Sequence, residues 1–109
     1  MKQEITNTLI INGSEWEFDK SILDSAVIND KVIIIFDYME YPKNEQAQNL
    51  VAYDLEKNTI WVAEHPTNQR NDAYVHITSE KPLKANNFAS YSCELNIDTG
   101  RIVNAEFYK

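Results

Sequence analysis

Two stretches in the second half of the chain have the sequence pattern of a β-hairpin, and they constrain the fold more than any other feature. In both, apolar and polar residues alternate on either side of a short turn, as they do along strands with one buried face. The first hairpin spans residues 49–64, with its turn at residues 55–58. The second spans residues 89–107, with Asp98 and Thr99 leading into Gly100. Asn58 and Gly100 are expected to adopt the left-handed conformation that these turns need. The pattern predicts an all-β fold.

Turn dipeptides predict two more hairpins in the first half of the chain. Asn12-Gly13 separates residues 8–11 from residues 15–18, and Asn29-Asp30 separates residues 26–28 from residues 31–36. Residues 32–36 are apolar at every position, which indicates a central strand covered on both faces. The remaining segments are one strand at residues 73–78 and expected loops at residues 42–48, 65–72 and 82–87.

These patterns predict one domain, residues 1–109, of eight or nine mostly antiparallel strands joined as a meander. A curved sheet, a small sandwich and a barrel are all compatible with them. Helix is expected to be nearly absent, with weak patterns for a single turn at residues 18–24 and 44–50. The predicted core consists of same-face residues of paired strands: Val32, Ile34, Phe36, Val51, Tyr53, Ile60, Val62, Tyr91, Cys93, Leu95, Val103, Ala105 and Phe107.

The first hairpin also resembles the strand pairs of β-propeller blades. The resemblance is carried by Leu50-Val51-Ala52-Tyr53-Asp54 followed by Trp61, and by a similar turn at residues 97–100. A propeller needs at least four blades of about 40 residues, so a chain of 109 residues has room for two or three and would close a propeller only by oligomerising. The resemblance therefore implies local hairpin chemistry, and no ligand or partner residue is carried over from that family.

The charge of the chain restricts its partners. Acidic residues outnumber basic ones by 17 to 10, which gives a net charge of −7. Such a surface repels phosphate backbones, so we expect no nucleic-acid partner. It attracts a basic protein, although a charge of this size also serves solubility alone. The longest apolar run is too short to cross a bilayer, no secretory signal opens the chain, and Cys93 has no second cysteine to pair with. We therefore expect a cytoplasmic protein without a membrane partner.

No residue pattern in the chain predicts catalysis, a metal site or a cofactor. His65 follows Glu64, but adjacent residues of a strand point to opposite faces and do not easily share one ion. His76 lies inside a strand pattern, and Cys93 alternates with apolar residues as a core cysteine does. With two glycines in the chain, no glycine-rich phosphate loop is expected.

The strongest candidate for a binding site is the segment that follows the central strand. It consists of Asp37, Tyr38, Met39, Glu40 and Tyr41, and it mixes carboxylates with residues that are enriched in the centres of protein interfaces. A frayed strand end with wetted tyrosines is the alternative interpretation.

We therefore expect a non-enzymatic interaction module with a basic protein partner, one version being an immunity or antitoxin-type protein. Self-association through exposed strand edges is a competing version. The alternative from another class is a small-molecule-binding barrel, or an enzyme of that shape, with a pocket lined by Trp16, Tyr53, Trp61 or His76.

Overall fold

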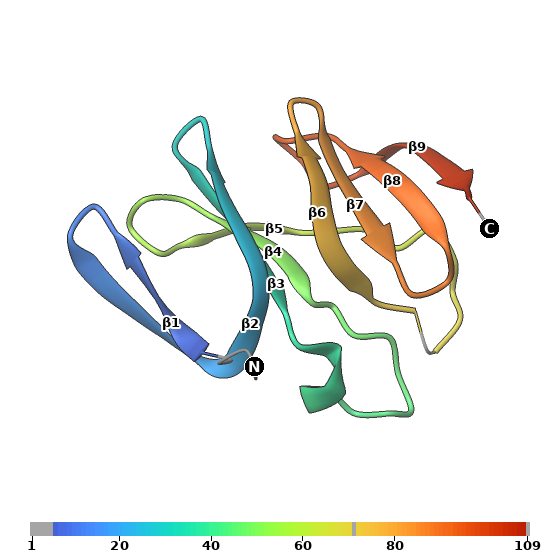
Figure 1. Cartoon of the computed structure of the whole chain (residues 1–109), viewed down its shortest axis with the longest axis horizontal. Helices are drawn as coiled ribbons and strands as arrows, with labels where there is room; N and C mark the ends of the chain where they lie inside the picture. The colour runs from blue at the N-terminus through green and yellow to red at the C-terminus, as the bar shows by residue number, and fades with distance from the viewer. Residues whose placement is uncertain (1–5, 71, 109) are drawn as a thin grey trace, which may run out of the picture.

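Each of the two sheets is a meander, because every strand pairs antiparallel with the strand next to it in sequence. The computed structural model describes residues 6–70 and 72–108. Figure 1 shows the two sheets packed against each other, which confirms the all-β prediction and its strand number. The first sheet contains β1 (Thr6–Ile11), β2 (Ser14–Ile28), β3 (Lys31–Phe36), β4 (Leu50–Tyr53) and β5 (Thr59–Val62). The second contains β6 (Tyr74–Glu80), β7 (Leu83–Asn87), β8 (Tyr91–Leu95) and β9 (Ile102–Phe107).

Three expected elements differ from the structure. Residues 18–24 form no helical turn but the middle of β2, which pairs with β1 and β3 through bulges that bend it. Residues 44–50 are not helical either, and the 3₁₀ turn η1 lies at Tyr38–Glu40. Residues 82–87 were expected to be a loop but contain β7, whose alternate residues Leu83, Ala85 and Asn87 are buried. Strand propensity is low in this segment, so packing decides its conformation.

The left-handed turn residues are partly as expected. Gly100 has a φ of 74°, and Asn12, Gly13, Asn29 and Asp30 all have positive φ. In the turn between β4 and β5, however, the positive φ of 70° belongs to Lys57. The prediction for Asn58 was wrong because Asp54 Oδ1 accepts the backbone N–H of Asn58 at 2.9 Å, which fixes its orientation. The hairpin that resembles a propeller blade lies at the edge of a five-stranded sheet, so the resemblance ends with the hairpin.

The first of two cores, the inter-sheet core, lies between the two sheets. Ile33 and Ile35 of β3 point into it, and Tyr74 is its largest fully buried member from the second sheet. Asn49 is fully buried beside it and joins the two sheets, since its amide donates to the carbonyls of Phe36 and Tyr74 and accepts the N–H of Tyr74. The other members include Leu50, Ala52, Trp61, Leu83, Ala85, Cys93 and Leu95.

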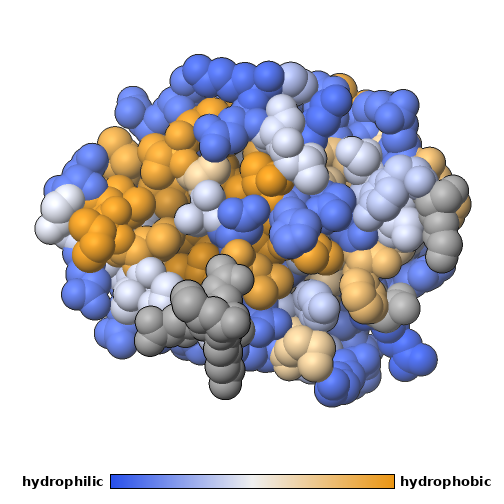
Figure 2. All heavy atoms as spheres, in the orientation of Figure 1, coloured by the Kyte–Doolittle hydropathy of each residue, from blue (hydrophilic) through white to orange (hydrophobic). Residues whose placement is uncertain are grey.

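The second core, the aromatic core, lies on the other face of β3, where the first sheet curls over itself. Val32, Ile34 and Phe36 point to this side, so both faces of β3 are buried, as its apolar run predicts. The hairpin of β1 and β2 brings Trp16 within 6.2 Å of Tyr53, measured between ring centroids. Figure 2 shows apolar side chains gathered on this side, at the left of the view over β1 and β2. The other members are Ile11 and Val51, with Leu9, Phe18, Ile22 and Tyr41 at the margin.

Four residues of the predicted core are exposed. Ile60 and Val62 lie on β5 and Val103 and Phe107 on β9, with exposed fractions of 40, 44, 59 and 59%. These two strands are sheet edges, where no neighbouring strand covers the outer residues. Alternation places such residues on a face but does not show whether anything covers that face.

Carboxylates join the two sheets where no ladder connects them. Asp24 of β2 accepts the N–H of Ile77 of β6 at 2.9 Å. On the other side, Glu64 accepts the N–H of Ile102 of β9 at 2.9 Å, and its own N–H donates to the carbonyl of Gly100. The sheets therefore form a sandwich that is linked at both sides without closing into a barrel.

Candidate functional site

The predicted segment, residues 37–41, turns away from the sheet at the end of β3 and forms η1. The carboxylate of Asp37 starts the turn by accepting the N–H of Met39 at 2.9 Å, as an N-cap residue does. Asp37 is itself held by a bond from its N–H to the carbonyl of Ser21 in β2. The turn carries Met39 outward, with 63% of its surface exposed.

The two carboxylates of this segment are engaged within the chain. Glu40 Oε1 accepts the N–H of Ser21 at 2.9 Å, and hydrogen bonding from the side chain and the backbone of Ser21 lowers the pKa of Glu40. Asp37 is used as the cap of η1. The acids of the predicted binding segment therefore anchor the turn to β2, while Met39 is its exposed apolar residue.

Tyr41 lies between the aromatic core and the outer surface. Lys20 Nζ lies over the ring of Tyr41, 4.8 Å from its centroid, in a cation–π geometry. Burial raises the pKa of Tyr41 to about 12. Tyr41 therefore ends the segment as a half-buried anchor.

An apolar cleft of about 250 Å³ lies beside η1. Tyr38 and Met39 form one wall, and Phe88, in the turn between β7 and β8, forms another. The rings of Tyr38 and Phe88 lie 5.2 Å apart at a tilt of 39°, and 56% of the surface of Phe88 is exposed. Ala47 and Ala73 complete the apolar lining. Two segments 50 positions apart in the sequence thus present exposed apolar side chains around one hollow.

Hydrogen bonds between two loops hold the remaining wall in place. Gln46 donates to the carbonyl of Thr67 at 2.7 Å, and His65 Nε2 lies 2.8 Å from the carbonyl of Ala47. Asp72 is buried, with one carboxylate oxygen bonded to Thr67 Oγ1 at 2.7 Å and the other to Asn87 Nδ2 at 2.5 Å. These bonds tie together the loops that carry the remaining wall of the cleft.

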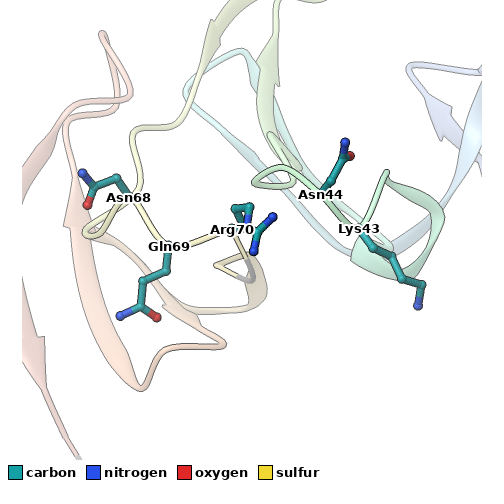
Figure 3. Close-up of a pocket in the computed structure, with 5 residues that line it drawn as sticks. All are labelled: Lys43, Asn44, Asn68, Gln69 and Arg70. Carbon is teal, nitrogen blue, oxygen red and sulfur yellow. The ribbon is translucent and has the colours of Figure 1, made fainter.

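A second, polar hollow of about 700 Å³ opens next to the apolar cleft, between the same two loops. Its lining residues are Lys43, Asn44, Asn68, Gln69 and Arg70, and Lys43 and Arg70 line the apolar cleft as well. Figure 3 shows the guanidinium of Arg70 directed toward the loop that carries Asn44 and Lys43, while the Lys43 side chain extends away from it. Every side chain of this lining carries N–H donors, and none is a carboxylate.

Reactive groups do not gather at either hollow. Cys93 is buried beside Tyr74, and burial raises its thiol pKa to about 11, so the thiol is protonated at neutral pH. His76 is exposed on β6. Across residues 6–70 and 72–108, no three His, Cys, Asp or Glu side chains are grouped to hold a metal ion. Over the same residues, no helix is long and apolar enough to cross a membrane.

The alternative pocket residues do not converge. Trp61 lies in the inter-sheet core and donates its indole N–H to the carbonyl of Ile97, whereas Trp16 and Tyr53 lie in the aromatic core. Sequence reasoning named residues 37–41, the segment in which η1 lies, but it did not predict the turn and missed Phe88 and Arg70. Phe88 stands out in the sequence as a single aromatic residue among Asn, Ala and Ser, which is the one local signal for it.

Comparison with known proteins gives the family of the chain but no activity. No curated protein and no solved structure matches it. One family matches residues 3–107, which is nearly the whole sequence. The chain therefore belongs to the family described as "Domain of unknown function (DUF7957)".

Proposed function

We propose that the protein is a non-enzymatic interaction module and that a protein partner inserts an apolar side chain into the cleft beside η1. The observation that carries this proposal is the pair of exposed apolar residues, Met39 and Phe88, that line one cleft. Met and aromatic residues are enriched in interface cores, where an anchor side chain fills a pocket of the partner.

The size of the cleft favours a side chain over a free small molecule. Sites for drug-sized ligands measure about 300–1,000 Å³. The apolar cleft, at about 250 Å³, is smaller than this range. The polar hollow beside it, at about 700 Å³, lies within the range, but its lining residues are all polar or charged, whereas ligand sites are lined mostly by apolar residues. The residues suggested for a ligand pocket, Trp16, Tyr53, Trp61 and His76, lie in three different places. The interaction module is therefore the better supported of the two functions.

The net charge of −7 supports a partner that is basic as a whole, because complementary potentials accelerate encounter. A small acidic protein that neutralises a basic toxin in the cytoplasm, of the immunity or antitoxin type, has this character. Self-association through the sheet edges stays a prediction.

The test uses random peptides displayed on phage and selected on the immobilised protein. Affinities of the selected peptides are then measured for the wild type and for the variants Met39→Ser and Phe88→Ser. We expect each variant to weaken binding about tenfold, the size of a hot-spot contact of about 1.4 kcal/mol.

Phe107→Ser is the matched control. Phe107 is 59% exposed and its ring lies 5.3 Å from that of Tyr91, so it has the exposure and the aromatic neighbour of Phe88 at a site away from the cleft. We expect its affinity to equal that of the wild type. Peptides that bind Phe88→Ser as well as the wild type, or a selection that yields no binder, would contradict the proposal.

A further inference from the structure

In the part of the chain that the structure describes, the two cations at the border of the apolar cleft form no ion pair, as is true of most of its lysines and arginines. Within residues 6–70 and 72–108, the ion pairs join Lys20 to Asp19 and Lys31 to Asp98. Lys43 and Arg70 are absent from these pairs, although acidic residues outnumber basic ones by 17 to 10. Both side chains are exposed and face solvent. In an acidic protein, this is a local reversal of the surface charge.

The surroundings of these cations favour an anion. The polar hollow that they line contains three amide side chains, which offer further N–H donors, and no carboxylate. Two carboxylates line the neighbouring apolar cleft. Asp72 is buried with both oxygens already bonded, and Glu45 is exposed. Neither of them lines the polar hollow.

We propose that the segment bound in the apolar cleft carries a carboxylate next to its apolar anchor, and that the Arg70 guanidinium binds this carboxylate while Lys43, at the same border, adds its positive charge. This inference rests on the proposed function. Because the two hollows share both cations, an acid within one or two residues of the anchor reaches them, consecutive Cα atoms being about 3.8 Å apart. A guanidinium matches a carboxylate with two parallel hydrogen bonds.

The occupant is therefore an acidic–apolar peptide segment within the partner. A nucleic-acid strand also offers anions beside apolar bases, but its many phosphates meet the surrounding charge of −7, whereas a single carboxylate meets mainly the border that carries Lys43 and Arg70. A partner that is basic overall presents such a segment as a local exception, as this protein does with Lys43 and Arg70.

The experiment uses two synthetic probes that differ by one group, N-acetyl-phenylalanyl-aspartic acid amide and its asparagine analogue. Each is titrated into the ¹⁵N-labelled protein at low salt, and the amide shifts of the cleft residues give the affinity. We expect the acidic probe to bind about fivefold more tightly, as two exposed ion pairs provide. The preference should shrink as salt is added.

The variants Lys43→Gln and Arg70→Gln, singly and together, test the assignment. We expect the double variant to bind both probes equally, with the affinity that the wild type has for the asparagine probe. Arg101→Gln is the control, because Arg101 is an exposed arginine outside both hollows, and it should keep the preference.

Two results would overturn this inference while leaving the proposed function intact: equal affinities of the wild type for the two probes, or a preference that survives in the double variant. Tighter binding of a single-stranded oligonucleotide than of the acidic probe would also overturn it. The Phe88→Ser variant tests the proposed function alone, because it removes the contact that the phenylalanine of both probes makes in the cleft.

Discussion

The inter-sheet core and the aromatic core lie on opposite faces of β3, and they are closed in different ways. The inter-sheet core is covered by a second sheet, and Ile33, Ile35 and Tyr74 are fully buried in it. The aromatic core is covered only by the curl of its own sheet, and its margin of half-buried rings is shielded by Lys20 and Lys57, each 4.8 Å from a ring centroid.

The difference shows how a chain of nine strands buries both faces of its central strand with only two sheets. Where a second sheet is present, aliphatic side chains and two buried rings, those of Trp61 and Tyr74, fill the space. Where it is missing, large rings and the alkyl stems of lysines complete the cover while the charged heads stay in water. The candidate site borders the second, more open region through Tyr41.

The largest expected effect tests the polar link of the inter-sheet core. Asn49→Leu leaves the carbonyls of Phe36 and Tyr74 and the N–H of Tyr74 without their partner, and each orphaned buried group costs about 1–3 kcal/mol. We expect a loss of roughly 5 kcal/mol in the free energy of unfolding. The counterpart Asn7→Leu removes one half-buried bond to the carbonyl of Phe18 and should cost about 1 kcal/mol. Urea denaturation measures both, and equal losses would contradict the comparison.

Adjacent isoleucines of β3 compare the two cores directly. Ile33 and Ile34 are both 0% exposed but point into the inter-sheet core and the aromatic core respectively. We expect Ile33→Ala to cost roughly 4 kcal/mol and Ile34→Ala roughly 3, because the open margin of the aromatic core lets its rings move into the space. A larger loss for Ile34→Ala in urea denaturation would show that the aromatic core is the tighter one.

The two glycines give a third comparison. Both have positive φ, but a Cβ at Gly100 overlaps the ring of Trp61, whereas a Cβ at Gly13 has open space around it. Gly100→Ala should therefore add overpacking to backbone strain and cost roughly 3 kcal/mol, against about 1 kcal/mol for Gly13→Ala. Thermal unfolding of the two variants measures the difference, and indistinguishable melting temperatures would show that the Trp61 ring moves aside freely.

The smallest expected effect is a local response to acid. Hydrogen bonding from Ser21 lowers the pKa of Glu40 below its ordinary value of 4.5, so the bond contributes fully above that value and is lost as pH falls through the lowered pKa. We expect the amide signal of Ser21 to titrate below pH 4.5 while that of Ala85, in the inter-sheet core, stays constant. In Glu40→Gln the Ser21 signal should not titrate, and a titration that persists there would assign it to another group.

Most of the strands and their meander order could be predicted because they are determined locally, whereas β7 and the middle of β2 were missed. Asn12-Gly13 and Asn29-Asp30 fix two turns, and the apolar run of β3 shows that both of its faces are covered. Which edge residues are covered depends on the other sheet, and alternation along β5 and β9 contains no information about it. For this reason Val62 and Phe107 were misplaced.

The candidate site was predictable only in its contiguous part. Tyr38 and Met39 belong to one segment whose composition already suggested an interface. Phe88 and Arg70 reach the cleft through pairing of β6 with β7 and through the loop bonds of Thr67, which are tertiary contacts without a local pattern. The sequence also could not predict that Asp37 and Glu40 accept hydrogen bonds within the chain, because the sequence does not show which donor a carboxylate will bind.

The carboxylates of Asp24 and Glu64 have a further consequence for how the molecule behaves in a crowded solution. Each occupies an N–H of an edge strand, that of Ile77 in β6 and that of Ile102 in β9. An unpaired N–H at an edge is a template on which a strand of another chain adds, the first step of aggregation. A bonded acid blocks that position and repels an approaching acidic copy. At Ile77 and Ile102, part of the negative charge of this chain therefore takes up the donors that an added strand would use.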